Sequence, residues 1–288
     1  MSVFEGKRLT IKSLLGKYFS RISITWLLTL AETALSILTP LFIGFAIDGL
    51  LEKELADFYW LGAVLGVLIL LSVARRIYDT RIYGTIRVEF GEELISRSSR
   101  KSVSTQNAQL GMSRELVDFL EEQVPALMNS IVQLAISFLV LFFFHPSLAY
   151  AAMVAAGAMI GIYAVFHRRF FRLNAEYNQQ TELQVSVLEE KSKGSILSHL
   201  NLLREAEVKL SDNEALVYGA IFAVLLAFLL FNLWFTATNL AITAGAIFSI
   251  VSYSWEFVEA ALVLPMTMQG WSRLSEIMKR INSGNEIQ

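Results

Sequence analysis

Two polar stripes run through apolar stretches that are long enough to cross a membrane. The first stripe, at steps of four, three, four and three residues, consists of Thr25, Thr29, Glu32, Ser36 and Thr39. The second, at the same steps, consists of Gly245, Ser249, Ser252, Glu256 and Glu259. Because these steps return to the same side of an α-helix, each set forms one polar face. Two matching faces predict that the two helices line one cavity.

The carboxylates in these stripes are the strongest candidates for chemistry. A charged side chain at membrane depth is costly unless it is hydrated, paired or protonated, so it marks a candidate substrate or ion pathway. Glu32 lies about ten residues, or roughly 15 Å of helix, inside its stretch, close to the middle of a bilayer. Glu256 and Glu259 lie nearer the end of theirs, beside Tyr253 and Trp255. Carboxylates next to aromatic faces favour an organic cation, and the alternative is a belt of interfacial side chains.

We therefore predict a pathway for a small cationic or amphiphilic substrate. Its candidate residues are Thr29, Glu32, Ser36, Ser249, Ser252, Tyr253, Trp255, Glu256 and Glu259. No catalytic residue is predicted. The sequence has no cysteine, and its three histidines lie far apart, so no metal-ligand spacing occurs and no metal or cofactor is expected in the chain.

The composition places these stretches in a bilayer. Of the 288 residues, 55% are hydrophobic and 17% are charged, which is too apolar for a soluble domain of this size. Apolar runs of spanning length occur at about 22–45, 58–74, 126–144, 148–166, 215–236 and 240–264. An all-α membrane protein with six transmembrane helices is predicted. The net charge of −2 gives no indication of a nucleic-acid partner.

The distribution of basic residues predicts the orientation. All but one of the 24 lysines and arginines lie in the N-terminal segment, in two long connections at 75–125 and 167–214, or after the last span; the exception is Lys53. The positive-inside rule then predicts a multi-pass protein of the cytoplasmic (inner) membrane with both termini cytoplasmic. The long connections have helical periodicity, which predicts two cytoplasmic helical hairpins with turns near Ser96–Gly111 and Lys191–Ser198.

Three segments are predicted along the chain. Residues 1–21 interleave basic and apolar side chains, which is typical of an amphipathic helix on the cytoplasmic leaflet. Residues 22–281 hold the six-helix domain, and residues 282–288 form a tail. Within the domain, Gly62 with Gly66 and Gly157 with Gly161 form GxxxG sequences, which predict close helix packing.

Several local patterns resemble the transmembrane domain of type I ABC exporters, whose fold is also called type IV. The residues that carry the resemblance are, in chain order, Pro40, Gly44, Ile47 and Asp48; Gly111, Ser113, Arg114 and Asp118; Glu190, Gly194 and Glu205; and Pro265, Gln269, Arg280 and Ile281. Each pattern alone is degenerate. Their order and spacing across nearly the whole chain carry the resemblance.

The resemblance implies a domain-swapped homodimer in which the fourth and fifth spans cross to the partner. It also implies alternating access, in which a central cavity opens to one side and then the other as ATPase domains grip the cytoplasmic tips. The residues expected to couple to such a partner are Ser104, Gly111, Arg114, Gly194 and Ser195.

The phosphate-binding sequence GxxxxGK[ST] does not occur in the chain. We therefore expect that the chain is not itself an enzyme, and that ATP and magnesium act only through a separate nucleotide-binding subunit. Three arrangements stay open from the sequence: a separate ATPase, a piece of a longer protein, or a domain that works without ATP as a channel or ion-coupled carrier. A non-transporting membrane scaffold is a further class of function.

Overall fold

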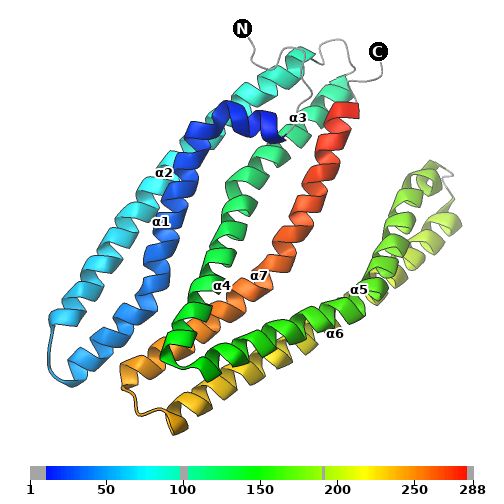
Figure 1. The fold of residues 1–288 in the computed structure, drawn as a ribbon. Helices are drawn as coiled ribbons and strands as arrows, with labels where there is room; N and C mark the ends of the chain where they lie inside the picture. The colour runs from blue at the N-terminus through cyan, green and yellow to red at the C-terminus, as the bar shows by residue number, and fades with distance from the viewer. Residues whose placement is uncertain (1–10, 98–102, 190–191, 284–288) are drawn as a thin grey trace. The chain divides into compact units, whose positions relative to one another are not determined.

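The computed structural model describes residues 11–97, 103–189 and 192–283, and nearly all of them are helical (Figure 1). The elements are α1 (Ile11–Leu51), α2 (Ala56–Arg97), α3 (Val103–Asp118), the π-helix η1 (Phe119–Gln123), α4 (Val124–Phe144), α5 (Pro146–Glu189), α6 (Lys193–Asn239) and α7 (Ala244–Ser283). No strand occurs among the described residues, which confirms the all-α prediction.

Among the described residues, six helical stretches are long and apolar enough to cross a membrane, at 15–51, 56–96, 110–144, 146–181, 193–239 and 244–263. Each overlaps one predicted span, which confirms their number and order. Most extend well past the predicted span, because the helices continue into the long connections as the periodicity indicates. A break between α5 and α6 lies close to the turn predicted near Lys191–Ser198, but the turn is shorter than expected, since α6 already begins at Lys193. The other predicted turn is shorter than expected, since α3 already begins at Val103.

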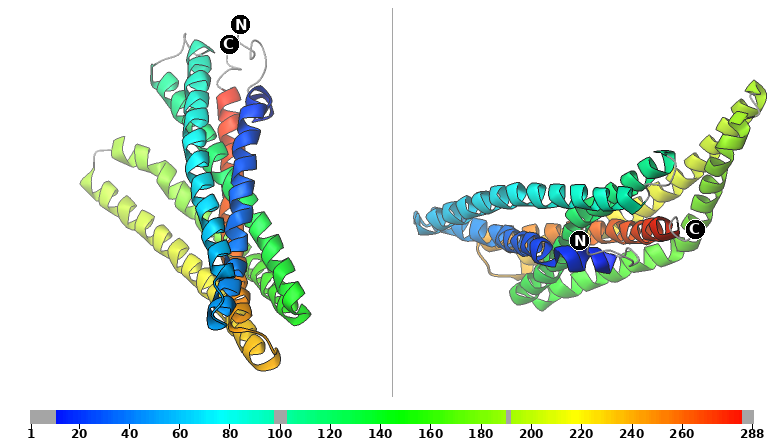
Figure 2. Two further views of the ribbon diagram at one scale, coloured as in Figure 1. Left: turned by 90° about the vertical axis from the view of Figure 1, so that its left-hand side faces the viewer. Right: turned by 90° about the horizontal axis from the view of Figure 1, so that it is seen from above.

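The helices form two compact units. Unit 1 contains α1 to α4, η1 and α7, and unit 2, residues 145–238, contains α5 and α6. Within unit 1, α1 packs against α2, α4 and α7, while α2 packs against α3 and α4 against α7. The views in Figures 1 and 2 show α1 and α2 side by side. We call the end of unit 1 where α1 begins and α7 ends the basal end, and the end with the α1–α2 turn the distal end.

A buried apolar cluster joins α1, α2, α3 and η1 near the basal end. Its members are Tyr18, Ile22, Tyr83, Ile86, Phe90, Leu94, Leu116, Val117, Phe119 and Leu120. Steps of four along α2, from Ile86 to Phe90 to Leu94, place these side chains on one face, which the other helices cover. Tyr18 belongs to the segment predicted as a separate amphipathic helix. In the structure α1 runs through Arg21 without a break, and residues 1–10 lie outside the described part.

The π-helix η1 interrupts the regular helix between α3 and α4. The N–H of Val124 donates to a carbonyl five residues back, as in a π-helix. The next residue, Pro125, has no N–H, so the carbonyl of Leu120 lacks the corresponding donor. The Tyr83 hydroxyl of α2 donates to this carbonyl at 3.1 Å, and it lies 3.2 Å from the Thr25 hydroxyl of α1. One buried tyrosine thus links three elements where the backbone pattern is broken.

Unit 2 is an antiparallel hairpin of α5 and α6. The buried residues of α6 are His199, Ala206, Asn213, Val217, Ile221, Leu225, Phe228, Asn232 and Thr236. Steps of three, four and seven place them on one face. At the far end from the hairpin turn, the ring of His145, just before α5, lies 5.0 Å from the Phe235 ring of α6, so the two helices are close together at this end.

Neither GxxxG sequence makes a close helix contact within its own unit. A Cβ atom placed at Gly62, Gly66, Gly157 or Gly161 would meet no atom within 4 Å. The predicted close packing at these four glycines is therefore wrong for contacts within each unit. The close approach of two helices occurs between α1 and α7 instead, as described below.

Candidate functional site

A seam of polar contacts joins α1 to α7 in the distal half of unit 1. The Tyr253 hydroxyl donates to the carbonyl of Ile37 at 2.7 Å, and the Ser249 hydroxyl lies 3.1 Å from the carbonyl of Pro40. Pro40 weakens the backbone pattern of α1 because it has no N–H. Tyr253 and Ser249 are 0% and 1% exposed. In this structure both serve helix packing and neither side chain is accessible.

Two glycines bring the backbones of α1 and α7 into direct contact. A Cβ atom on Gly44 would lie 2.6 Å from the carbonyl oxygen of Gly245, and one on Gly245 would lie 2.7 Å from the carbonyl carbon of Gly44. Asp48 then closes the seam, because its carboxylate accepts hydrogen bonds from the Gly245 N–H (2.8 Å) and the Thr243 hydroxyl (2.5 Å). A carboxylate in this place satisfies an N–H at the start of α7 and favours the helix dipole.

The polar stripe of α1 faces protein over much of its length. Thr25 and Thr29 are buried, and each donates to a carbonyl one turn earlier in its own helix. Thr39 does the same at 3.1 Å. Ser36 is the exposed member of the stripe. Hydroxyl groups bonded back to their own helix add little polarity to a cavity, so the stripe acts mainly as a packing surface here.

Glu32 is ion-paired. Its carboxylate accepts hydrogen bonds from Arg75 Nε and, at 2.6 Å, from the Ser72 hydroxyl, while Arg75 also binds Asp79 at 3.0 Å. The Glu32 and Arg75 side chains are 22% and 26% exposed. The arginine neutralises the isolated charge on which the predicted cation role of Glu32 depended. The ion pair instead joins α1 to α2.

Glu256 and Glu259, one turn apart on α7, have different surroundings. One carboxylate oxygen of Glu256 is buried without a hydrogen bond of normal geometry, and the buried Ser137 hydroxyl of α4 lies beside the carboxylate. Glu259 is exposed and accepts a hydrogen bond from the Trp255 indole N–H at 2.6 Å. Ser252 is partly buried. Glu256 is therefore a carboxylate with unused hydrogen-bonding capacity between α4 and α7.

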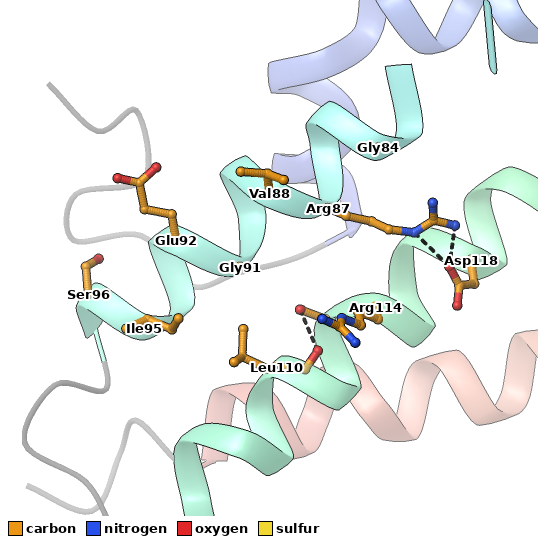
Figure 3. Close-up of a pocket in the computed structure, with 11 residues that line it drawn as sticks. Gly84, Arg87, Val88, Gly91, Glu92, Ile95, Ser96, Leu110, Arg114 and Asp118 are labelled. Carbon is orange, nitrogen blue, oxygen red and sulfur yellow. Dashed lines mark hydrogen bonds and ion pairs between the residues drawn. The ribbon is translucent and has the colours of Figure 1, made fainter. Parts of the chain in front are cut away.

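At the basal end, a groove of about 870 Å³ opens between α2 and α3 (Figure 3). Its lining residues are Gly84, Arg87, Val88, Gly91, Glu92, Ile95, Ser96, Leu110, Ser113, Arg114 and Asp118. Where the walls approach most closely, a Cβ atom on Gly91 would lie 3.4 Å from Leu110. We call this cavity the basal groove.

Charged side chains both brace and border the basal groove. Figure 3 shows Arg87 reaching from α2 to Asp118 on α3, where its two nitrogens lie 3.0 and 2.6 Å from one carboxylate oxygen. Arg87 also binds Glu121 in η1. Glu92 and Arg114 are exposed and make no ion pair with any described residue. The ion pairs of Arg87 therefore hold the two walls of the groove together. Glu92 and Arg114 leave one negative and one positive charge unpaired at its border.

The residues predicted to couple to a partner fall into both units. Arg114 lines the basal groove, and Gly111 lies exposed one turn earlier on α3. Gly194 and Ser195 lie in the first turn of α6, at the turn of the unit 2 hairpin. The side chain of Ser104 lies outside the described part of the chain.

Comparison with protein families matches residues 11–245 to the model described as ABC transporter transmembrane region. The chain belongs to this family. No curated protein matches it. The matched ABC transporter transmembrane region includes both walls of the basal groove and the contact of Gly44 with Gly245, so both features lie within the family's own part of the chain.

Arg75, Arg87 and Tyr83 are structural residues of this ABC transporter transmembrane region that sequence reasoning missed. A signal for two of them exists. Once the α1–α2 turn is placed at residues 52–55, Glu32 and Arg75 lie equally far from it along the chain, and Thr25 and Tyr83 very nearly so. Residues at equal distances from the turn of an antiparallel helical hairpin lie at the same height along the two helices. The contacts of Glu32 with Arg75 and of Thr25 with Tyr83 could therefore have been predicted from the sequence.

Proposed function

We propose that this chain is the membrane subunit of a transporter that works as a homodimer and moves a small cationic or amphiphilic substrate by alternating access. Its basal end is cytoplasmic, and it lies in the inner membrane. A separate nucleotide-binding subunit supplies ATP hydrolysis. The observation that carries the proposal is the family match across residues 11–245.

The basal groove suits the docking of that nucleotide-binding subunit. Glu92 and Arg114 stand exposed and unpaired at its border, so a partner with complementary charges gains two new ion pairs there. The Arg87 fork to Asp118 and Glu121 fixes α2 against α3 and η1. Movement imposed at the groove is thereby passed to α2 and, through η1, to α4.

The apolar surface of α2 supports the homodimer. None of the most apolar 18 residues in this span is buried within the chain. Its exposed large side chains include Val67, Ile69, Leu70 and Val73. Part of this surface is covered by a second copy in the domain-swapped arrangement that we propose, with α5 and α6 crossing to the partner.

Glu256 is the residue to which we assign the substrate cation. It lies on α7 with an unpartnered buried oxygen, near the exposed Trp255 and Glu259. A carboxylate beside an aromatic ring attracts an organic cation through charge and the ring face. When α4 and α7 separate during alternating access, the Glu256 carboxylate becomes accessible to the substrate.

Transport of a lipophilic cation tests this function. Membrane vesicles containing the chain and its nucleotide-binding subunit are expected to accumulate tetraphenylphosphonium on addition of Mg-ATP. Glu256→Gln keeps the side-chain shape and removes the charge, so we expect about tenfold slower accumulation, because one close charge interaction is worth about 1–4 kcal/mol. Glu54→Gln, at an exposed carboxylate near the α1–α2 turn, is the matched control and leaves the rate unchanged.

Other outcomes decide against the proposal. Equal rates for wild type and Glu256→Gln contradict the assignment of the cation to Glu256. Accumulation that needs a proton gradient and no ATP favours an ion-coupled carrier. Absence of any ATP- or gradient-driven movement, for tetraphenylphosphonium and for a panel of amphiphiles, favours a scaffold.

A further inference from the structure

A cluster of three arginines lies where the apolar part of α5 ends. The apolar run at 148–166 is followed by His167-Arg168-Arg169-Phe170-Phe171-Arg172. Arg168, Arg169 and Arg172 are separated by one, three and four residues, so they are neighbours on the helix surface. We call these three residues the arginine cluster. Its position is the boundary between hydrocarbon and headgroups, if the apolar run crosses the bilayer.

The arginine cluster is exposed and almost unpaired. Arg168 and Arg169 make no ion pair with a described residue. Arg172 has only a long contact, 3.8 Å, to Glu176, and its side chain is 71% exposed. Such an exposed ion pair contributes little. The adjacent Phe171 ring is 69% exposed, as expected for an aromatic side chain at a membrane interface.

Acidic residues on α6 do not cancel this charge. Asp212 and Glu214 lie on α6 level with the arginine cluster, since α5 and α6 run antiparallel (Figure 1). Neither forms an ion pair with the three arginines. The cluster is left with positive charge directed to its surroundings.

An apolar stripe leads from the arginine cluster along the same face of α5. Gly161, Gly157 and Val154 precede Arg168 at steps of seven, four and three residues and are exposed. Because the two glycines carry no side chain, the stripe is shallow there, with no atom within 4 Å of a Cβ position. One leaflet, about 15 Å thick, corresponds to about ten residues of helix. A chain that starts at Arg168 thus reaches Ala158.

Ala158 lies at the border of an apolar groove between α5 and α6. The groove measures about 650 Å³ and is lined by Val154, Ala158, Val224 and Phe228, among others. All of these features belong to unit 2. Three features therefore follow one another over the length of a lipid acyl chain. They are the arginine cluster, the shallow apolar stripe and the apolar groove.

We propose that this face of α5 binds an anionic phospholipid. The arginine cluster holds the phosphate-bearing headgroup, and one acyl chain lies along the glycine stripe and enters the groove. Charge complementarity selects an anionic headgroup, while the apolar stripe selects a lipid over a soluble phosphate. This inference is independent of the transported substrate and of any ATPase.

Native mass spectrometry of the purified full chain tests the proposal. After incubation with equal amounts of phosphatidylglycerol and phosphatidylcholine of the same acyl chains, the wild-type protein is expected to retain phosphatidylglycerol preferentially. An arginine near an anionic surface contributes a factor of roughly five in binding. Arg168→Gln/Arg169→Gln should therefore lower the preference by more than tenfold, and Arg168→Lys/Arg169→Lys should keep most of it.

The charge-matched control removes two positive charges elsewhere on the same hairpin. Lys193→Gln/Arg204→Gln changes two exposed residues on α6 nearer its turn, and it should leave the preference as in wild type. All three double variants concern exposed side chains, and an unchanged elution volume on gel filtration shows that they are folded. Equal preference in wild type and Arg168→Gln/Arg169→Gln, or equal loss in the control, overturns the proposal. Displacement of the lipid by millimolar inorganic phosphate also overturns it, because it shows a soluble-anion site.

Discussion

Gly245→Ala is expected to lower the free energy of unfolding by about 2–3 kcal/mol, the cost of overpacking a close contact. A methyl group there would lie 2.6 Å from the Asp48 carboxylate, 2.7 Å from the Gly44 carbonyl carbon and closer still to the Gly44 carbonyl oxygen. Backbone atoms cannot rotate away as a flexible side chain can. The helices α1 and α7 must therefore separate, which also lengthens the hydrogen bond between Asp48 and the N–H of residue 245.

Reversible unfolding in mixed detergent micelles measures this effect. Gly157→Ala is the matched control, since a Cβ atom there meets nothing within 4 Å. Alanine in an open helix position is favoured over glycine by about 0.5–1 kcal/mol, so the control should be slightly stabilised. A similar change in both variants would mean that the contact between α1 and α7 does not exist in the protein.

Arg75→Gln is expected to destabilise the protein by about 3 kcal/mol, because it leaves two carboxylates without their cation in a poorly solvated place. Asp79 is 6% exposed, and Glu32 has only the Ser72 hydroxyl as its remaining partner. Arg76→Gln, at the exposed neighbouring residue, is the control and should change stability by less than about 0.5 kcal/mol.

A second substitution separates the lost ion pair from other effects of Arg75→Gln. Glu32→Gln in the Arg75→Gln background removes one of the unpaired charges, so the double variant should be more stable than Arg75→Gln alone. If the loss of stability of the double variant relative to wild type equals the sum of the losses of the two single variants, Glu32 and Arg75 do not interact.

The sequence predicts the helices well because their signals are local. Six apolar runs, two long periodic connections and the turn near Lys191 follow from hydropathy and spacing alone. Whether a residue of the polar stripes is buried, ion-paired or accessible depends on neighbours that are distant in sequence. Spacing places Thr29 and Glu32 on one face, but only the fold shows that Thr29 is buried and that Glu32 meets Arg75, 43 residues away.

The glycines show the same limit. GxxxG is a pattern of one helix, whereas a close contact needs small residues on two helices at the same height. Gly44 and Gly245 meet that condition although neither belongs to a GxxxG sequence. For the basal groove, Arg114 was predicted through the family resemblance, while Glu92 and Arg87 carried no sequence signal, because α2 and α3 meet only after the chain has turned back.

Photocrosslinking from the basal groove tests most directly whether a nucleotide-binding subunit drives this chain. With p-benzoylphenylalanine replacing Arg114 in the complete transporter, we expect crosslinks to a subunit whose peptides include the GxxxxGK[ST] sequence, at a yield that changes on addition of Mg-ATP. The same probe replacing Lys53, in the α1–α2 turn at the distal end, should give none. If the probe at position 114 captures no such subunit while the co-purified ATPase crosslinks to residues 1–21, docking at the basal groove is contradicted.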